Sequence, residues 1–545
     1  MKTFSSSALL LSALVAFSSE ASAFAAPSSG SPLLLHSQVR INAVSTAAPA
    51  PGIHQRLGGG HGESTRLHMA LGVRGGAAIS KSVSDIASSL GTSDPQSLFN
   101  TSLLGLAMVT FVFKVVQRTA ASGSDGGDVV EEKPASIKSL QAKFLSVFWI
   151  LRCSDWLQGP YFYEVYTSKI FDGAPASMAL VSKLFLTGFA SRAVFGPSVG
   201  RASDQYGRKK ATLAFCAIYA LGALSTKSPL LSVLLLGRVL SGVGTALLFS
   251  APESWLVGAA QKSGDDPTGK YLGETFGMAY AGDAIVAIVA GQLAGLAASR
   301  SGPTGPFELS SGFLGVGFLL ASLLWKENRS ASADTDEKPS IADAVQVIRK
   351  DPKIVLVGAV QSLFEAAMYI FVLQWPPALS SAVGSTFGEA AKTPYGTVFS
   401  CFMASCLLGS TIFGQMAKMN IKTENFAAAM LSIATVAMSV ATWSVKAGGG
   451  ANLATIVASF FAFEACVGMY FPSIGTLRSK YVPDSHRSVI MNLFGIPLNV
   501  LVVSVFLSIN KLGLAGALGV STGALGVATL CMLQLLKSIG KEEVA

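Results

Sequence analysis

A dense group of charges separates two apolar runs at Gly200-Arg201-Ala202-Ser203-Asp204-Gln205-Tyr206-Gly207-Arg208-Lys209-Lys210. The apolar runs cover residues 178–199 and 211–223. Because four cations and one acid cannot remain together in hydrocarbon, this charged turn marks one face of a membrane. Gly200 and Gly207 permit the tight reversal that would bring the flanking helices together. We expect Asp204 to face the N-terminal end of another helix or to pair with an arginine. The alternative is that the charges of this turn only set the topology of the chain in the membrane.

The composition predicts a polytopic membrane protein. Of 545 residues, 50% are hydrophobic and 13% are charged, which is about half the charged fraction of a soluble protein. The net charge of +9 is therefore assigned to loops on one membrane face, not to a nucleic-acid surface. The six cysteines lie in apolar runs, and four of the five histidines precede residue 70. We expect no metal site, no cofactor and no enzymatic activity.

The N-terminus has the form of a leader. Residues 1–23 resemble a secretory signal peptide, with Lys2, an apolar run and the cleavage motif Ala21-Ser22-Ala23. Residues 24–80 start at Phe24 and carry four arginines but one acid, Glu63. This pattern resembles the bipartite plastid leaders of algae with complex plastids, which predicts a plastid envelope or related membrane. The alternative is an ordinary signal peptide with a polar tail, in the plasma membrane or an endomembrane.

Thirteen apolar runs are long enough to span a bilayer. The first, residues 98–117, is an extra N-terminal helix followed by a linker at 118–141. The other twelve form two groups of six, at 142–325 and 354–536, separated by a charged linker at 326–353 and followed by a tail at 537–545. The predicted fold is therefore all-α, with two six-helix halves and one additional helix.

Lysine and arginine are distributed unequally over the loops of the twelve helices. One set of alternate loops, together with the C-terminus, carries nineteen, and the other set carries six. We call the first side the basic face and the second the opposite face; the basic face is the cytosolic-equivalent side.

The two halves repeat. Asp155 and Glu365 are 210 residues apart, and Glu253 and Glu464 are 211 apart. A parallel repeat of this kind places a binding site between the halves near mid-membrane, and transport then proceeds by rocking of the halves.

Acids in the middle of apolar helices are the first candidates for function, because an ionised side chain at the bilayer centre costs about 2.5–3.5 kcal/mol. Asp155, Glu365 and Glu464 are such acids. Helical spacing puts Asp155 and Gln158 on one face of their helix, and Gln361, Glu365 and Tyr369 on one face of another. A carboxylate removed from water binds a proton more readily, so these acids could load a proton with the substrate; the alternative is pairing with an intramembrane arginine.

Arginines inside the apolar runs suit an anion. Arg238 begins a segment rich in small residues at 238–244 and would either contact an anion or neutralise Asp155. Glu253 lies too far along the same helix to contact Arg238. The candidate substrate and proton residues are Asp155, Gln158, Arg238, Glu253, Gln361, Glu365, Tyr369 and Glu464; the anion candidates are Arg152 and Arg192; the candidate gating turn is Gly200, Asp204, Gly207, Arg208 and Lys209.

The charged turn resembles the loop between the second and third helices of the major facilitator superfamily, and residues 238–244 resemble its helix-4 motif. Further segments resemble the molybdate-anion transporter family, at residues 154–161, 247–255, 364–371, 468–473, 478–483 and 496–498. The resemblance covers about residues 143–536. Arg152 and Arg192 depart from the family's pattern.

This resemblance implies alternating access around a cavity lined by helices 1, 4, 7 and 10. It implies molybdate or a similar small oxyanion as substrate, with protons as a candidate coupling ion, in a lipid-embedded monomer without a nucleic-acid partner. The alternatives are a proton-coupled carrier of an organic solute and a transport-dead sensor or scaffold.

Overall fold

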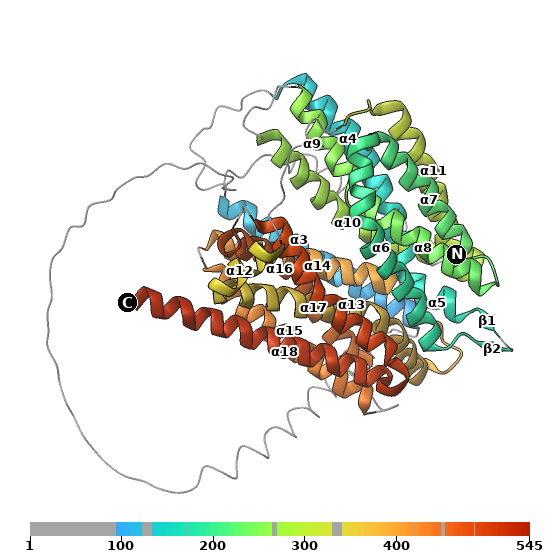
Figure 1. Cartoon of the computed structure of the whole chain (residues 1–545). Helices are drawn as coiled ribbons and strands as arrows, with labels where there is room; N and C mark the ends of the chain where they lie inside the picture. The colour runs from blue at the N-terminus through green and yellow to red at the C-terminus, as the bar shows by residue number, and fades with distance from the viewer. Residues whose placement is uncertain are drawn as a thin grey trace, which may run out of the picture.

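A computed structural model shows that the chain folds almost entirely as helices (Figure 1). The structure describes residues 94–121, 133–171, 173–263, 270–329, 341–419, 421–447, 453–483 and 486–544. The predicted signal peptide at 1–23 and transit-like segment at 24–80 lie outside the described residues.

The N-terminal half contains two broken helices. Its first helix is interrupted at Gly159 by a 3-10 turn that contains Pro160, because proline lacks an N–H and clashes with the preceding helical turn. Its fourth helix is interrupted after Leu248. The elements of this half are α4 (Ala135–Gln158), η1 (Gly159–Tyr161), α5 (Phe162–Thr167), the hairpin strands β1 (Ile170–Phe171) and β2 (Ala174–Pro175), α6 (Met178–Tyr206), α7 (Arg208–Ser225), α8 (Leu231–Leu248), α9 (Ala251–Ser263), α10 (Lys270–Ser301), η2 (Gly302–Thr304) and α11 (Gly305–Leu324).

The C-terminal half begins with a short helix that precedes the membrane-length helices. Its first long helix contains Pro376 and Pro377. The elements are α12 (Ile341–Lys350), α13 (Pro352–Phe387), α14 (Tyr395–Lys418), α15 (Thr423–Lys446), α16 (Leu453–Tyr481), α17 (Arg487–Leu507) and α18 (Ile509–Val544).

Ten stretches of the described residues are long and apolar enough to cross a membrane. One of them, Tyr271–Leu324, contains both α10 and α11, and another, Leu231–Lys262, contains α8 and α9. The helices α4 and α7 carry more charges and fall outside the ten, although both are packed within the N-terminal bundle. We count α10 and α11 as two helices, count α8 and α9 as one broken helix, and add α4 and α7. The described residues then confirm two six-helix halves preceded by one extra helix, α3 (Pro95–Ala121).

The two halves use the same internal packing. In the N-terminal half α6 packs on α8, α7 on α8, α10 on α4 and α11 on α7. The C-terminal half has the matching contacts of α14 with α16, α15 with α16, α17 with α13 and α18 with α15. The repeat predicted from the spacing of the acids is thus present in the packing of the helices.

The halves meet through α10 with α14 and through α6 with α17. At the first contact, a Cβ on Gly396 would lie 2.3 Å from the carbonyl oxygen of Gly291, so only glycine permits this approach. Ser400 Oγ donates to the carbonyl oxygen of Ile288 at 2.8 Å. At the second contact the rings of Phe185 and Phe506 lie 5.2 Å apart.

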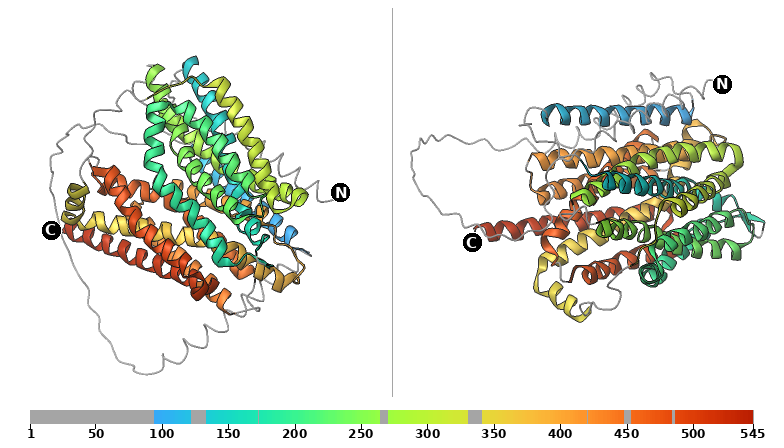
Figure 2. Two further views of the ribbon diagram at one scale, coloured as in Figure 1. Left: turned by 45° about the vertical axis from the view of Figure 1, so that its right-hand side comes forward. Right: turned by 90° about the horizontal axis from the view of Figure 1, so that it is seen from above.

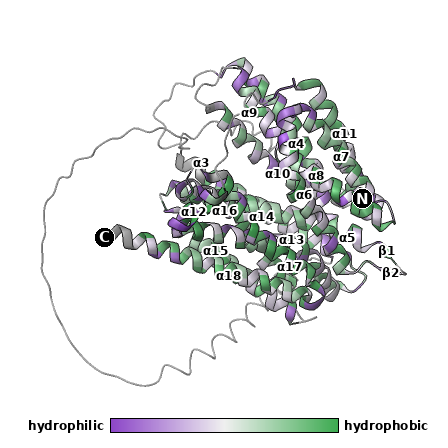
Figure 3. Cartoon of the chain, in the orientation of Figure 1, coloured by the Kyte–Doolittle hydropathy of each residue, from purple (hydrophilic) through white to green (hydrophobic). Residues whose placement is uncertain are grey.

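These contacts lie toward the opposite face. Gly396 and Ser400 are in the first turns of α14, just after Lys392 of an opposite-face loop, and Phe506 is at the end of α17. Figure 1 shows the halves diverging from this region, and in Figure 3 the hydrophilic colour is concentrated near α9 and α12. In this conformation the two halves therefore contact each other at the opposite face.

The extra helix α3 packs against α14 on the outside of the bundle (Figure 2). Gln96 Nε2 donates to Thr397 Oγ1 at 2.8 Å, and Cys401 Sγ donates to the carbonyl oxygen of Phe99 at 3.4 Å. Because both pairs follow the same chain direction, α3 runs parallel to α14 and begins on the opposite face. Its bounds extend beyond the predicted 98–117 at both ends.

The start of α3 is capped by Asp94, whose carboxylate accepts hydrogen bonds from the backbone N–H and the hydroxyl of Ser97 at 3.0 and 2.7 Å. These bonds hold the pKa of the Asp94 carboxyl below its ordinary value. The outward side of α3 is apolar and exposed, at Met108 and Val112 for example, which suits a lipid-facing helix.

Candidate functional site

The charged turn is largely helical. α6 continues through Gly200 and Asp204 to Tyr206, and the chain reverses at Gly207 alone, where φ is +120°. The prediction that Gly200 contributes to the reversal is therefore wrong. A helix can extend beyond the apolar layer, and charged residues in its last turns do not require it to end.

The reversal is fixed by an acid from the end of the same half. Glu327 Oε1 accepts the backbone N–H of Lys209 at 2.9 Å, and Glu327 Oε2 accepts that of Lys210 at 3.0 Å. A carboxylate at this position caps the N-terminus of α7 and complements its dipole. Of the two partners expected for Asp204, the structure shows the arginine: Arg208 lies at 3.0 Å.

A buried ion pair joins the first and fifth helices. Arg152 of α4 donates to Asp283 of α10 through Nε at 2.9 Å and Nη2 at 2.8 Å. Trp156 Nε1 donates to the same carboxylate at 2.8 Å. Arg152 and Asp283 are 7% and 8% exposed, so each supplies most of the compensation that the other's charge requires.

Asp155 lies beside this pair. Its Oδ2 is 3.8 Å from Arg152 Nη1, and its Oδ1 accepts a hydrogen bond from the Tyr219 hydroxyl at 2.5 Å. Gln158 was expected on the same face, but its Nε2 donates to Ser310 Oγ of α11 at 2.9 Å and is buried there. Asp155 is thus held against α7 and Gln158 against α11, so the two do not act on one face.

Arg238 makes no ion pair within the described residues. Its Cζ lies 4.7 Å from the centroid of the Phe162 ring, and its Nε donates to the carbonyl oxygen of Leu184 at 3.3 Å. The expected neutralisation of Asp155 by Arg238 is therefore absent from this conformation, where the Phe162 ring and the Leu184 carbonyl contact the guanidinium and Tyr166 interacts with it.

Arg192 connects the two halves. Its Cζ lies 4.9 Å from the centroid of the Phe249 ring in the N-terminal half. Its guanidinium also interacts with the side chain of Tyr369 in α13 of the C-terminal half. No described carboxylate lies within ion-pair distance of Arg192, although Glu365 interacts with it over a longer range. We call Arg192, Phe249, Glu365 and Tyr369 the inter-half site.

Glu365 and Gln361 share a partner in α16. The Tyr470 hydroxyl lies 3.1 Å from Glu365 Oε1 and 3.5 Å from the carbonyl oxygen of Gln361. The side-chain Oε1 of Gln361 is buried and has no hydrogen-bond partner among the described atoms. The face that Gln361, Glu365 and Tyr369 were expected to share is therefore directed toward two helices. These are α16, which carries Tyr470, and α6, which carries Arg192.

The other two predicted acids lie elsewhere. Glu464 is 6% exposed, and its Oε2 accepts a hydrogen bond from Cys406 Sγ of α14 at 3.0 Å, so it belongs to the contact between α14 and α16. Glu253, in the first turn of α9, accepts the Tyr280 hydroxyl at 2.6 Å.

Four residues around the site were not singled out from the sequence. Asp283 is an acid in an apolar run, and the rule that identified Asp155 applies to it equally. Phe249 precedes Pro252 at a helix break, which the proline signals. The roles of Tyr219 and Tyr470 depend on partners from other helices, and no sequence pattern indicates them.

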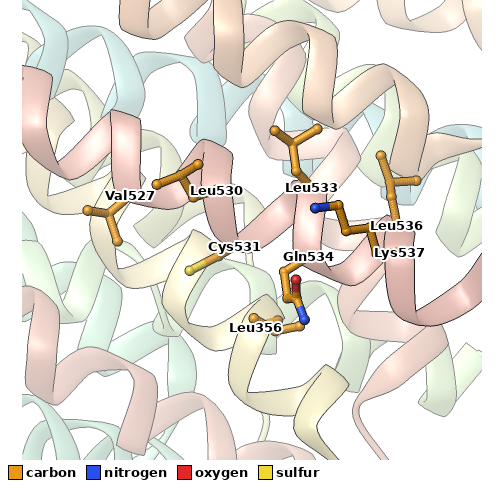
Figure 4. A pocket seen from close by; sticks show the side chains of 8 residues that line it. All are labelled: Leu356, Val527, Leu530, Cys531, Leu533, Gln534, Leu536 and Lys537. Atoms are coloured by element: carbon orange, nitrogen blue, oxygen red, sulfur yellow. The ribbon is translucent and has the colours of Figure 1, made fainter.

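A separate apolar groove of about 590 Å³ lies between α13 and the C-terminal part of α18 (Figure 4). Its lining comes only from these two helices of the C-terminal half, so it is distinct from the inter-half site. The lining residues are Leu356, Val527, Leu530, Cys531, Leu533, Gln534, Leu536 and Lys537.

Two halves with matching internal packing, joined at one face and carrying charged residues between them, define a membrane carrier of the major facilitator class. Residues 98–466 match the model of a family described as sugar transporters with 12 transmembrane helices. The chain belongs to this major facilitator family, and its members are transporters, not enzymes.

Curated relatives and a solved structure agree with this assignment. The molybdate-anion transporter of Xenopus tropicalis is 29% identical over 370 residues, which cover 67% of this chain and 78% of the relative. That of Takifugu rubripes is 29% identical over 392 residues, with the same coverage. A crystal structure of the peptide transporter POT in complex with sulfate aligns with a TM-score of 0.59 at 14% identity, covering 76% of this chain and 96% of that one; this likeness concerns the fold.

Proposed function

We propose that this carrier transports molybdate or a closely similar small oxyanion by alternating access of its two halves. The observation that carries the proposal is Arg192, a cation without an ion pair among the described residues, held between Phe249 and Tyr369 of different halves. An anion bound there would contact both halves at once, and its binding would then depend on how they are arranged. The relatives named molybdate-anion transporter support this substrate class.

The donors of the inter-half site suit a tetrahedral oxyanion. A guanidinium offers several N–H groups in a fixed plane and forms strong charge-assisted bonds with oxyanions. The Tyr369 hydroxyl adds a neutral donor from the other half. Arg152 does not offer the same charge, because Asp283 occupies two of its nitrogen atoms.

A second candidate is a carrier of an organic solute. The description of the matching family as sugar transporters favours it, and so does the aromatic lining supplied by Phe249 and Tyr369. Competition by unlabelled solutes against labelled molybdate distinguishes the two: sulfate competes if the site recognises oxyanions, and a monosaccharide competes if it recognises sugars.

We further propose that Glu365 carries the coupling proton. Glu365 interacts over a longer range with Arg478 and with Arg192, so an arriving anion and an ionised Glu365 would compete for the positive charge of Arg192. A proton on Glu365 removes the repulsion between its carboxylate and the anion, so anion and proton would bind together.

Uptake of labelled molybdate into proteoliposomes, measured across a series of pH values, tests both parts of the proposal. Wild-type uptake should rise as the external pH falls. Glu365→Gln, which imitates the protonated side chain, should flatten this pH dependence while the protein remains in the membrane. Glu389→Gln, at an exposed loop position, should keep the wild-type profile. An unchanged profile in well-expressed Glu365→Gln would rule out coupling through this acid.

We propose that the protein acts as a monomer, since the inter-half site lies within one chain. We also propose that residues 1–80 direct the chain to a plastid envelope or related membrane. The start of α3 on the opposite face is the side to which a signal peptide would deliver the chain, and this supports the signal-peptide part. A fluorescent fusion of residues 1–80 should reach plastids in a complex-plastid alga, and Phe24→Ala should hold it in the secretory route. Equal localisation of both fusions would favour the plain signal peptide.

A further inference from the structure

The break in the fourth helix of the N-terminal half exposes one aromatic side chain, Phe249. α8 ends at Leu248 and α9 begins at Ala251, and Pro252 cannot donate the hydrogen bond that a continuous helix would need. Phe249 has non-helical backbone angles at this break and is 46% exposed, in contrast to the buried aromatic residues of the same bundle.

The ring of Phe249 contacts two guanidiniums that come from different helices. Arg152 Cζ of α4 lies 5.0 Å from the ring centroid, and Arg192 Cζ of α6 lies 4.9 Å from it. Both distances are within the range in which the ring quadrupole attracts a cation. One aromatic side chain therefore contacts the positive charges of two helices.

The two arginines differ in their compensation. Arg152 is paired with Asp283 and lies 3.8 Å from Asp155, whereas Arg192 has no ion pair among the described residues. Asp155 is compensated only partly by Arg152 and Tyr219, so it is the acid beside Arg152 with which Arg192 would pair if its contact with the ring were lost.

We infer that Phe249 is a positioning residue for the proposed oxyanion site: it holds Arg192 toward Tyr369 of the other half and away from Asp155, which keeps the positive charge of Arg192 available to the anion. The inference rests on the proposed function and assigns to Phe249 a role in setting the affinity of the inter-half site for the anion. Without the ring, Arg192 pairs with Asp155 and the anion must displace a carboxylate.

Kinetics of molybdate uptake by the full-length protein in proteoliposomes test the inference. Phe249→Leu should raise the KM about 2- to 5-fold, which corresponds to the loss of one cation–π contact at a partly exposed site, and should leave the maximal rate nearly unchanged. Phe249→Tyr, which keeps an aromatic face, should retain a KM close to the wild-type value. Phe318→Leu, at an exposed position on α11, is the matched control and should have no effect.

A second substitution separates positioning from general packing. Adding Asp155→Asn to Phe249→Leu removes the competing carboxylate and should restore most of the lost affinity. A wild-type KM in Phe249→Leu, or a KM defect that Asp155→Asn does not relieve, would overturn the inference. Absence of saturable molybdate uptake by the wild-type protein would instead overturn the proposed function.

Discussion

Replacement of Arg192 by glutamine is expected to raise the KM for molybdate about 10- to 150-fold. A hydrogen bond to a charged partner contributes about 1.5–3 kcal/mol, and each 1.4 kcal/mol corresponds to a factor of ten in affinity. The protein should remain in the membrane, because Arg192 forms no ion pair among the described residues whose loss would leave a buried acid uncompensated. The measurement is the concentration dependence of molybdate uptake in proteoliposomes.

The matched control for this prediction is Lys183→Gln. Lys183 lies on the same helix, α6, and its side chain is exposed. The control removes one positive charge from the helix without altering the inter-half site, so its KM should equal that of the wild type. Equal KM values for Arg192→Gln and the wild type would show that the anion binds elsewhere.

Asp283→Asn is expected to destabilise the protein by about 3–5 kcal/mol, because it leaves the buried charge of Arg152 without its main partner. Expression level and thermal unfolding of the detergent-solubilised protein measure this loss. Asp155→Asn should cost much less, since Asp155 is 3.8 Å from Arg152 and is more exposed than Asp283.

Removing both charges of the pair tests the physical reason. The double substitution Arg152→Met with Asp283→Leu leaves no buried ion uncompensated and should recover most of the stability. A stable Asp283→Asn protein, or a larger loss in Asp155→Asn, would show that Arg152 is neutralised by another group.

The fold could be predicted because its signals are local. Apolar runs of spanning length and the asymmetry of lysine and arginine between loops follow from the solvent properties of a bilayer. The repeated spacing of Asp155 with Glu365 follows from the internal repeat of the two halves. The charged turn predicted the reversal between α6 and α7, and Gly207 provides it. α6 extends to Tyr206, beyond the apolar run predicted to end at residue 199, because helical hydrogen bonds continue into water beyond the apolar layer.

The candidate site could be predicted only in part, because side-chain partners come from distant segments. Helical periodicity grouped Asp155 with Gln158, but neighbouring helices take these two side chains in different directions, toward Tyr219 and Ser310. The intramembrane charge of Arg152 was recognised, and its pairing with Asp283 depends on the packing of α4 against α10. The sequence predicts Arg192 as an anion candidate, whereas its position between the halves depends on the fold.

The most direct test of the central claim is counterflow of labelled molybdate in proteoliposomes. A carrier that alternates around one anion site exchanges external label for internal substrate, so vesicles preloaded with unlabelled molybdate should accumulate label faster than empty vesicles. Preloading with a monosaccharide should give no acceleration, and Arg192→Gln should lose the effect at low molybdate concentration. Equal accumulation in loaded and empty vesicles, or acceleration by the monosaccharide alone, would contradict the account.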